Sequence, residues 1–148
     1  MKNSLLIISI LLLIGVNTAK AQRSFISTYV EKTHVSPKQG VNLGFEFKGG
    51  FEVGMFYQKE SSVLENRESS KPRFYEKKFT GISISGPVLI RSAYDIKLNV
   101  RTGISNNINF AITPSILANW KVLSRLEINT GLGIRAFKPT YIVGIRIH

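Results

Sequence analysis

Apolar and polar residues alternate strictly between Val41 and Gln58, with one interruption at Gly49-Gly50. One face of this stretch carries the apolar set Val41, Leu43, Phe45, Phe47, Phe51, Val53, Met55 and Tyr57. The other face carries Asn42, Gly44, Glu46, Lys48, Glu52, Gly54, Phe56 and Gln58. Alternation at every second residue is typical of β-strands with two unlike faces, and glycine accepts the positive φ that tight hairpins need. The stretch therefore predicts two antiparallel strands joined by a tight turn.

The same alternation recurs along the chain and predicts about eight strands. Besides the hairpin, the expected strands cover residues 23–32, 74–85, 94–104, 108–120, 125–135 and 141–148. Expected connections are 34–39, 59–73, 87–93, 105–107, 121–124 and 137–140, with Gly86-Pro87 ending the fourth strand. Pro114 lies inside the sixth strand and predicts a β-bulge, because proline donates no ladder hydrogen bond. The fold class expected is all-β, a single antiparallel up-and-down barrel.

Residues 1–21 have the pattern of a cleaved export signal. Lys2 precedes an apolar run at 5–16, which is too short to span a bilayer, and Ala19-Lys20-Ala21 is a small-x-small cleavage site. Residues 22–148 are then one domain, which keeps 18 of the 20 Lys and Arg residues and all 9 acidic residues. The chain has no cysteine, so it has no disulfide framework. Export makes nucleic acid a poor partner despite the basic charge.

The orientation of the two faces decides between a membrane barrel and a soluble one. The polar faces combine glycines with charges of both signs, which suits a narrow lumen where buried charges must pair. The predicted lumen charge network consists of Glu46, Glu52, Asp95, Lys97, Arg101, Glu127, Arg135 and Arg146. No helical apolar stripe is present, and a sheet can cross a membrane only as a closed barrel. These features favour a transmembrane β-barrel whose apolar face points to lipid.

Loops and aromatic residues support the same interpretation. With a periplasmic N-terminus, the longest expected loop, 59–73, lies outside the cell, as in bacterial membrane barrels. Aromatic residues of the apolar face fall at strand ends, where interfacial girdles are expected. The outer girdle would contain Tyr57, Phe74 and Tyr141, and the periplasmic girdle Phe47, Phe51, Tyr94 and Trp120.

With these features in place, the chain resembles the small eight-stranded outer-membrane β-barrel proteins of the type common in Bacteroidota, similar in architecture to the OmpA and OmpX barrels. The resemblance covers the signal ending AKAQ and the strands from Val41 to the end. The terminal strand YIVGIRIH resembles the C-terminal signal that the barrel assembly machinery recognises. The resemblance implies location in the outer membrane of a Gram-negative cell and contact with its lipid and lipopolysaccharide.

Candidate chemistry is sparse. The histidines, His34 and His148, are expected at opposite ends of the barrel, and neither a metal site nor a cofactor site is predicted. His34-x-Ser36 resembles the His-x-Ser pair of barrel lipid A deacylases, with Glu31 or Glu46 to orient the imidazole. A solvated turn is the favoured interpretation, because such a pair arises often by chance. A basic cluster beside the long loop is a candidate lipopolysaccharide contact: Lys71, Arg73, Lys77 and Lys78.

The function expected is therefore non-enzymatic. The protein would be an integral outer-membrane barrel whose charged lumen is closed by its own side chains, with a structural role or a surface role through residues 59–73 and an unidentified partner. A pore is the alternative interpretation of the lumen. Two alternatives come from other classes: a soluble periplasmic barrel that binds a small apolar ligand, and the lipid A-modifying enzyme.

Overall fold

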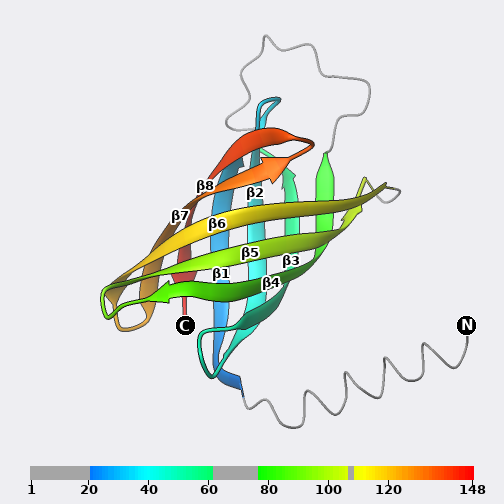
Figure 1. Cartoon of the computed structure of the whole chain (residues 1–148). Coiled ribbons are helices and arrows are strands. Elements are labelled where there is room, and N and C mark those ends of the chain that lie inside the picture. The colour runs from blue at the N-terminus through cyan, green and yellow to red at the C-terminus, as the bar shows by residue number, and fades with distance from the viewer. Residues whose placement is uncertain (1–20, 62–76, 107–108) are drawn as a thin grey trace, which may run out of the picture.

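The computed structural model describes residues 21–61, 77–106 and 109–148, and these residues form one closed antiparallel barrel (Figure 1). Its strands are β1 (Ala21–Lys32), β2 (Pro37–Phe47), β3 (Glu52–Glu60), β4 (Lys78–Ile90), β5 (Tyr94–Ser105), β6 (Asn109–Leu123), β7 (Leu126–Arg135) and β8 (Lys138–Ile147). Each strand pairs with the next along the chain, and β1 pairs with β8 to close the barrel. The prediction of an all-β up-and-down barrel with eight strands is confirmed.

The alternation of the sequence becomes an inside and an outside. On β3, Phe56 and Gln58 are buried within the barrel, whereas Met55 and Tyr57 are exposed on its outer surface. The pattern also resolves β1, where both faces mix apolar and polar residues: Phe25, Ser27 and Tyr29 point inward, whereas Ile26 and Thr28 point outward. The outer surface is therefore apolar and the interior largely polar.

The predicted hairpin at Gly49-Gly50 is confirmed, since both glycines have positive φ values, 90° and 82°. The last hairpin differs from its prediction. Its turn is formed by Ala136 and Phe137, which have φ values of 49° and 62°, and β8 already begins at Lys138. Two adjacent residues with positive φ make the turn whose twist matches paired strands, so Pro139 is free to lie within the strand.

Pro37, Pro87 and Pro114 do not have the effects on the strands that the sequence predicts. Pro37 lies in the first position of β2, so the first turn is only 33–36. β4 continues through Gly86-Pro87 to Ile90, with a register shift between Pro87 and Leu89. No bulge occurs at Pro114: β5 pairs with β6 in unbroken register there, and the β6–β7 ladder begins only at Ser115. Because Pro114 lies beyond that ladder, its missing N–H removes no β6–β7 hydrogen bond.

The two ends of the barrel differ in their connections. The described N-terminal residues and the C-terminus lie at the same end as the β2–β3, β4–β5 and β6–β7 turns, whereas the β1–β2 and β7–β8 turns lie at the opposite end (Figure 1). We call these the terminal end and the loop end. Residues 1–20, which contain most of the predicted export signal, and residues 62–76 lie outside the described part of the chain. In the part described, no helix is long and apolar enough to cross a membrane.

Candidate functional site

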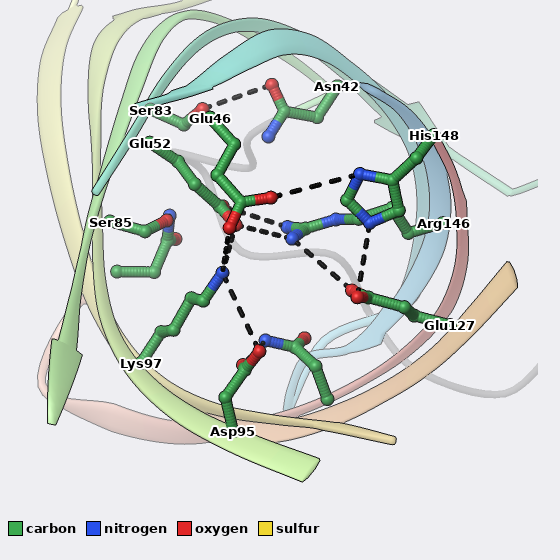
Figure 2. A network of polar contacts seen from close by, with 12 residues as sticks. Asn42, Glu46, Glu52, Ser83, Ser85, Asp95, Lys97, Glu127, Arg146 and His148 are labelled. Atoms are coloured by element: carbon green, nitrogen blue, oxygen red, sulfur yellow. Dashed lines mark hydrogen bonds and ion pairs between the residues drawn. The ribbon is translucent and has the colours of Figure 1, made fainter. Parts of the chain in front are cut away.

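The polar interior of the barrel is the candidate site, and its centre at the terminal end is Glu52. This carboxylate is 2% exposed and lies on the first residue of β3. Arg146 of β8 donates to it from Nη1 and Nη2 at 2.5 and 3.0 Å, and the Lys97 ammonium of β5 donates to Oε1 (Figure 2). A buried carboxylate with a bidentate arginine and a lysine is well neutralised.

Further acidic groups surround Glu52, Lys97 and Arg146. Together with these three residues they form the Glu52 cluster. The Glu127 carboxylate lies 3.7 Å from Arg146 and 3.2 Å from the imidazole of His148. Glu46 and Asp95 lie 4.0 and 3.8 Å from the Lys97 ammonium, and Asn119 donates to Asp95 at 2.5 Å. The members of the Glu52 cluster are Glu46, Glu52, Asp95, Lys97, Asn119, Glu127, Arg146 and His148. Four carboxylates thus meet two permanent cations, so this end of the lumen is acidic.

A second cluster lies toward the loop end and is centred on Glu31, which is fully buried. Its Oε2 accepts hydrogen bonds from Gln58 at 2.7 Å, Arg101 at 2.9 Å and Arg135 at 3.2 Å. Arg135 also donates to Gln58 Oε1 at 2.7 Å, and Arg101 donates to the Tyr29 hydroxyl at 3.1 Å. We call these five residues the Glu31 cluster. One carboxylate here contacts two guanidinium groups, so cations are in excess and the balance of charge is opposite to that of the Glu52 cluster.

Aromatic rings cover the guanidinium groups of both clusters. Arg135 lies 4.9 Å from the ring centre of Phe79, and Arg146 lies 4.4 Å from that of Phe25. Arg101 lies 5.2 Å from the centre of the Tyr29 ring. Cations in this position are attracted by the ring face, and the contact is stronger where water is excluded. The inward aromatic residues therefore fill the barrel and also hold its charges in place.

The described residues leave little empty space between the two clusters. A cavity of about 30 Å³ lies there, bordered by Ser27, Asn42, Asn99 and Asn129 together with Arg101 and Arg146 from the two clusters. This volume suits one or two water molecules rather than a continuous channel.

The structure places all eight residues of the predicted lumen network inside the barrel, but it divides them between the Glu31 and Glu52 clusters. Arg101 and Arg135 belong to the Glu31 cluster, and the other six belong to the Glu52 cluster. Sequence reasoning did not assign Glu31, Gln58 or Tyr29 to the lumen network. Continuing the β1 alternation from Phe25 would have placed Tyr29 and Glu31 inside, but the mixed composition of both faces concealed it.

The other candidate residues lie apart from these clusters. His34 Nε2 lies 3.0 Å from the Lys138 ammonium in the loop-end turns, while Glu31 is bonded inside the barrel and Glu46 lies at the terminal end. The proposed His-x-Ser pair therefore does not have Glu46 beside it. Lys77 and Lys78 are exposed where β4 begins, whereas Lys71 and Arg73 lie outside the described residues. Among described residues, no group of acidic, histidine or cysteine side chains could hold a metal ion.

The outer surface carries the expected aromatic residues at both ends. Tyr57 and Tyr141 are 46% and 59% exposed toward the loop end, and Tyr94 and Trp120 face each other in the β5–β6 register toward the terminal end. Phe47 and Phe51 flank the β2–β3 turn with ring centres 6.5 Å apart. Phe74, predicted for the outer girdle, lies outside the described residues.

The fold is similar to that of designed membrane proteins. One solved structure is a de novo designed transmembrane β-barrel, with a TM-score of 0.66 and 10% identity over 86% of this chain and 98% of that chain. Another is the solution NMR structure of the de novo designed TMB2.3, with a TM-score of 0.61 and 8% identity over 84% of this chain and 94% of that one. No protein-family profile and no curated protein matches the chain. The likeness shows the transmembrane-barrel fold alone, and any inference about the biological role comes from the residues of this chain.

Proposed function

We propose that the protein is a small integral barrel of the bacterial outer membrane, with OmpA/OmpX-like architecture, a closed charged lumen and a non-enzymatic role. That role is structural support of the envelope or surface interaction through the connection between β3 and β4. The single observation that carries the proposal is the inversion of the barrel: its outer surface is apolar, while fully buried carboxylates such as Glu31 and Glu52 lie inside. Lipid is the solvent that suits such an exterior.

The extent of the exposed apolar surface supports this proposal. Every described strand contributes outward apolar side chains, among them Met55, Ile112, Leu132 and Val143, each more than half exposed. Soluble monomers rarely expose contiguous apolar areas of this kind. The export pattern of residues 1–21 and the aromatic residues near both ends add support for the outer membrane.

The soluble alternative would require an apolar interior to hold an apolar ligand. Here the interior contains the Glu31 and Glu52 clusters, and the space between them is about 30 Å³. A ligand site of ordinary size encloses roughly 300 Å³ or more. The described interior therefore favours a filled lumen over a carrier of apolar ligands.

Heat-modifiability tests the membrane location. Residues 22–148 refolded into detergent micelles should migrate differently on a denaturing gel when boiled and when unboiled, because a closed barrel resists unfolding by the gel detergent. The same treatment without micelles is the control and should give no such difference. A monodisperse protein in plain buffer with no mobility difference would contradict the proposal and favour the soluble alternative.

The closed lumen makes a separate prediction. Purified, refolded protein in a planar bilayer should give no discrete conductance steps, since the two clusters occupy the cross-section on both sides of the small central cavity. A large porin reconstituted in the same way provides the positive control. Reproducible steps that scale with the amount of inserted protein would show that the lumen conducts and would contradict the closed state.

A further inference from the structure

A groove of about 740 Å³ runs across the outer surface of β7, β8, β1, β2 and β3. Its lining follows one row of paired residues, in which each residue lies opposite the next: Ile128, Ile145, Thr28, Val41 and Tyr57. Ile128 is near the start of β7 at the terminal end, and Tyr57 is near the end of β3 at the loop end. Because the row climbs across the tilted strands, the groove extends from one end of the apolar surface toward the other.

A second groove, of about 690 Å³, shares Val41 and Tyr57 with the first. It continues past Leu43 and Met55 to Phe45 and Val53, near the turn at the terminal end of β2 and β3. The described residues that line it include no charged side chain. Two apolar grooves thus diverge from one point at the loop end, near Tyr57.

Two lysines lie at this meeting point. Lys59 lines the first groove, and it is directly opposite Lys78 in the β3–β4 register. Both side chains point outward, because their neighbours Gln58 and Phe79 are fully buried in the barrel. Within the described residues, neither lysine forms an ion pair. Like charges directly opposite each other on paired strands are destabilising, so an anion between them would be favoured.

We propose that Lys59 and Lys78 bind the phosphate of a membrane lipid whose acyl chains occupy the two grooves. This inference rests on the proposed membrane location and deepens it by naming the partner chemistry: a phosphorylated lipid with at least two chains. It places the anion contact on strand residues, with Lys59 as a residue that sequence reasoning did not select. The head group lies beside the lysines at the loop end, and the chains follow the grooves toward the terminal end.

Selectivity for this lipid comes from its head group. Other lipid tails are as apolar as the grooves, so chain packing distinguishes little between lipids. Each lysine ammonium attracts anionic lipid at the membrane surface. Two lysines together enrich such a lipid beside the groove by about tenfold or more. The experiment must therefore compare head groups with identical chains and must also locate the chains.

Quenching of a single tryptophan by brominated lipid meets both needs. The sole tryptophan is removed by Trp120→Phe, and a reporter is placed in the shared part of the grooves by Tyr57→Trp. The matched reporter is Leu132→Trp, which is also the fourth residue from the loop end of its strand and lines neither groove. Each protein is refolded in phosphatidylcholine vesicles that contain a minor share of brominated phosphatidic acid or brominated phosphatidylcholine.

The reporter at position 57 should show about tenfold local enrichment of phosphatidic acid, and the reporter at 132 should show none. Lys59→Gln with Lys78→Gln should bring the enrichment at position 57 to within about twofold of unity. Lys48→Gln with Lys121→Gln, two lysines at the terminal end, should leave it unchanged. Inorganic phosphate, which has no chains, should not displace the brominated lipid.

The outcomes separate the two proposals. Equal quenching by both lipids at position 57, enrichment that survives the Lys59 and Lys78 substitutions, or displacement by inorganic phosphate would overturn the lipid site while leaving the membrane barrel intact. Absence of quenching by any lipid at both reporters would show that the barrel is not inserted, and the proposed function itself would then fail.

Discussion

Glu52→Gln should lower the free energy of unfolding by about 3–5 kcal/mol, because it leaves the buried Lys97 and Arg146 without their shared counter-charge. The amide retains the shape of the carboxylate, so the loss reports charge and hydrogen bonding rather than a cavity. Urea unfolding from lipid vesicles, followed by the fluorescence of Trp120, measures the effect.

Glu46→Gln is the matched control, since Glu46 lies directly opposite Glu52 in the β2–β3 register. Its side chain is 21% exposed and lies 4.0 Å from the Lys97 ammonium and 3.9 Å from the His148 imidazole, without a close ion pair, so the expected change is within about 1 kcal/mol. A loss below about 1 kcal/mol for Glu52→Gln would show that the Glu52 cluster does not hold the barrel together.

Tyr29→Ala should also be strongly destabilising, by about 3–5 kcal/mol, the range for removing a buried ring. The Tyr29 ring lies over Gly40 of β2, where a Cβ on the glycine would stand 2.4 Å from the ring. Gly144 lies opposite Tyr29 in the β1–β8 register. A Cβ on this glycine would stand 2.8 Å from the Tyr29 Cβ. Without the ring, space opens over Gly40, and Arg101 loses a hydrogen-bond acceptor and an aromatic contact.

Tyr29→Phe separates these contributions. It keeps the ring over Gly40 and removes only the hydroxyl that accepts from Arg101, so we expect a loss of about 1–2 kcal/mol. The same urea titration in vesicles compares the two variants. Similar losses for alanine and phenylalanine would mean that the hydrogen bond, and not the packing of the ring against Gly40, accounts for the role of Tyr29.

The two clusters give the lumen an internal polarity. Carboxylates outnumber permanent cations in the Glu52 cluster at the terminal end, whereas two arginines share one carboxylate in the Glu31 cluster. Buried charges of this kind are costly unless they are paired, so the barrel needs its strands in one register for every pair to form. Side chains that close the lumen thereby also specify the register.

Local pattern was sufficient to predict the strands and which residues face inward on most of them. In β5, for example, Lys97 and Arg101 alternate with Leu98 and Val100, and the structure has the same division. The effects of prolines on the strands were predicted poorly. Pro87 and Pro114 are tolerated because of where ladders to neighbouring strands shift or end, and this depends on the partner strand rather than on the residues beside each proline.

The sequence by itself determined the barrel, its strand number and its apolar and polar faces, because side chains alternate with a period that each strand sets locally. Only the tertiary structure decided which charges meet. Glu52 lies 45 residues from Lys97 and 94 from Arg146, and Glu31 lies 70 residues from Arg101. These contacts cross the lumen, so they depend on strand register, tilt and closure, which no local pattern contains. The opposition of Lys59 and Lys78 beside a groove arises in the same way, from the pairing of two strands.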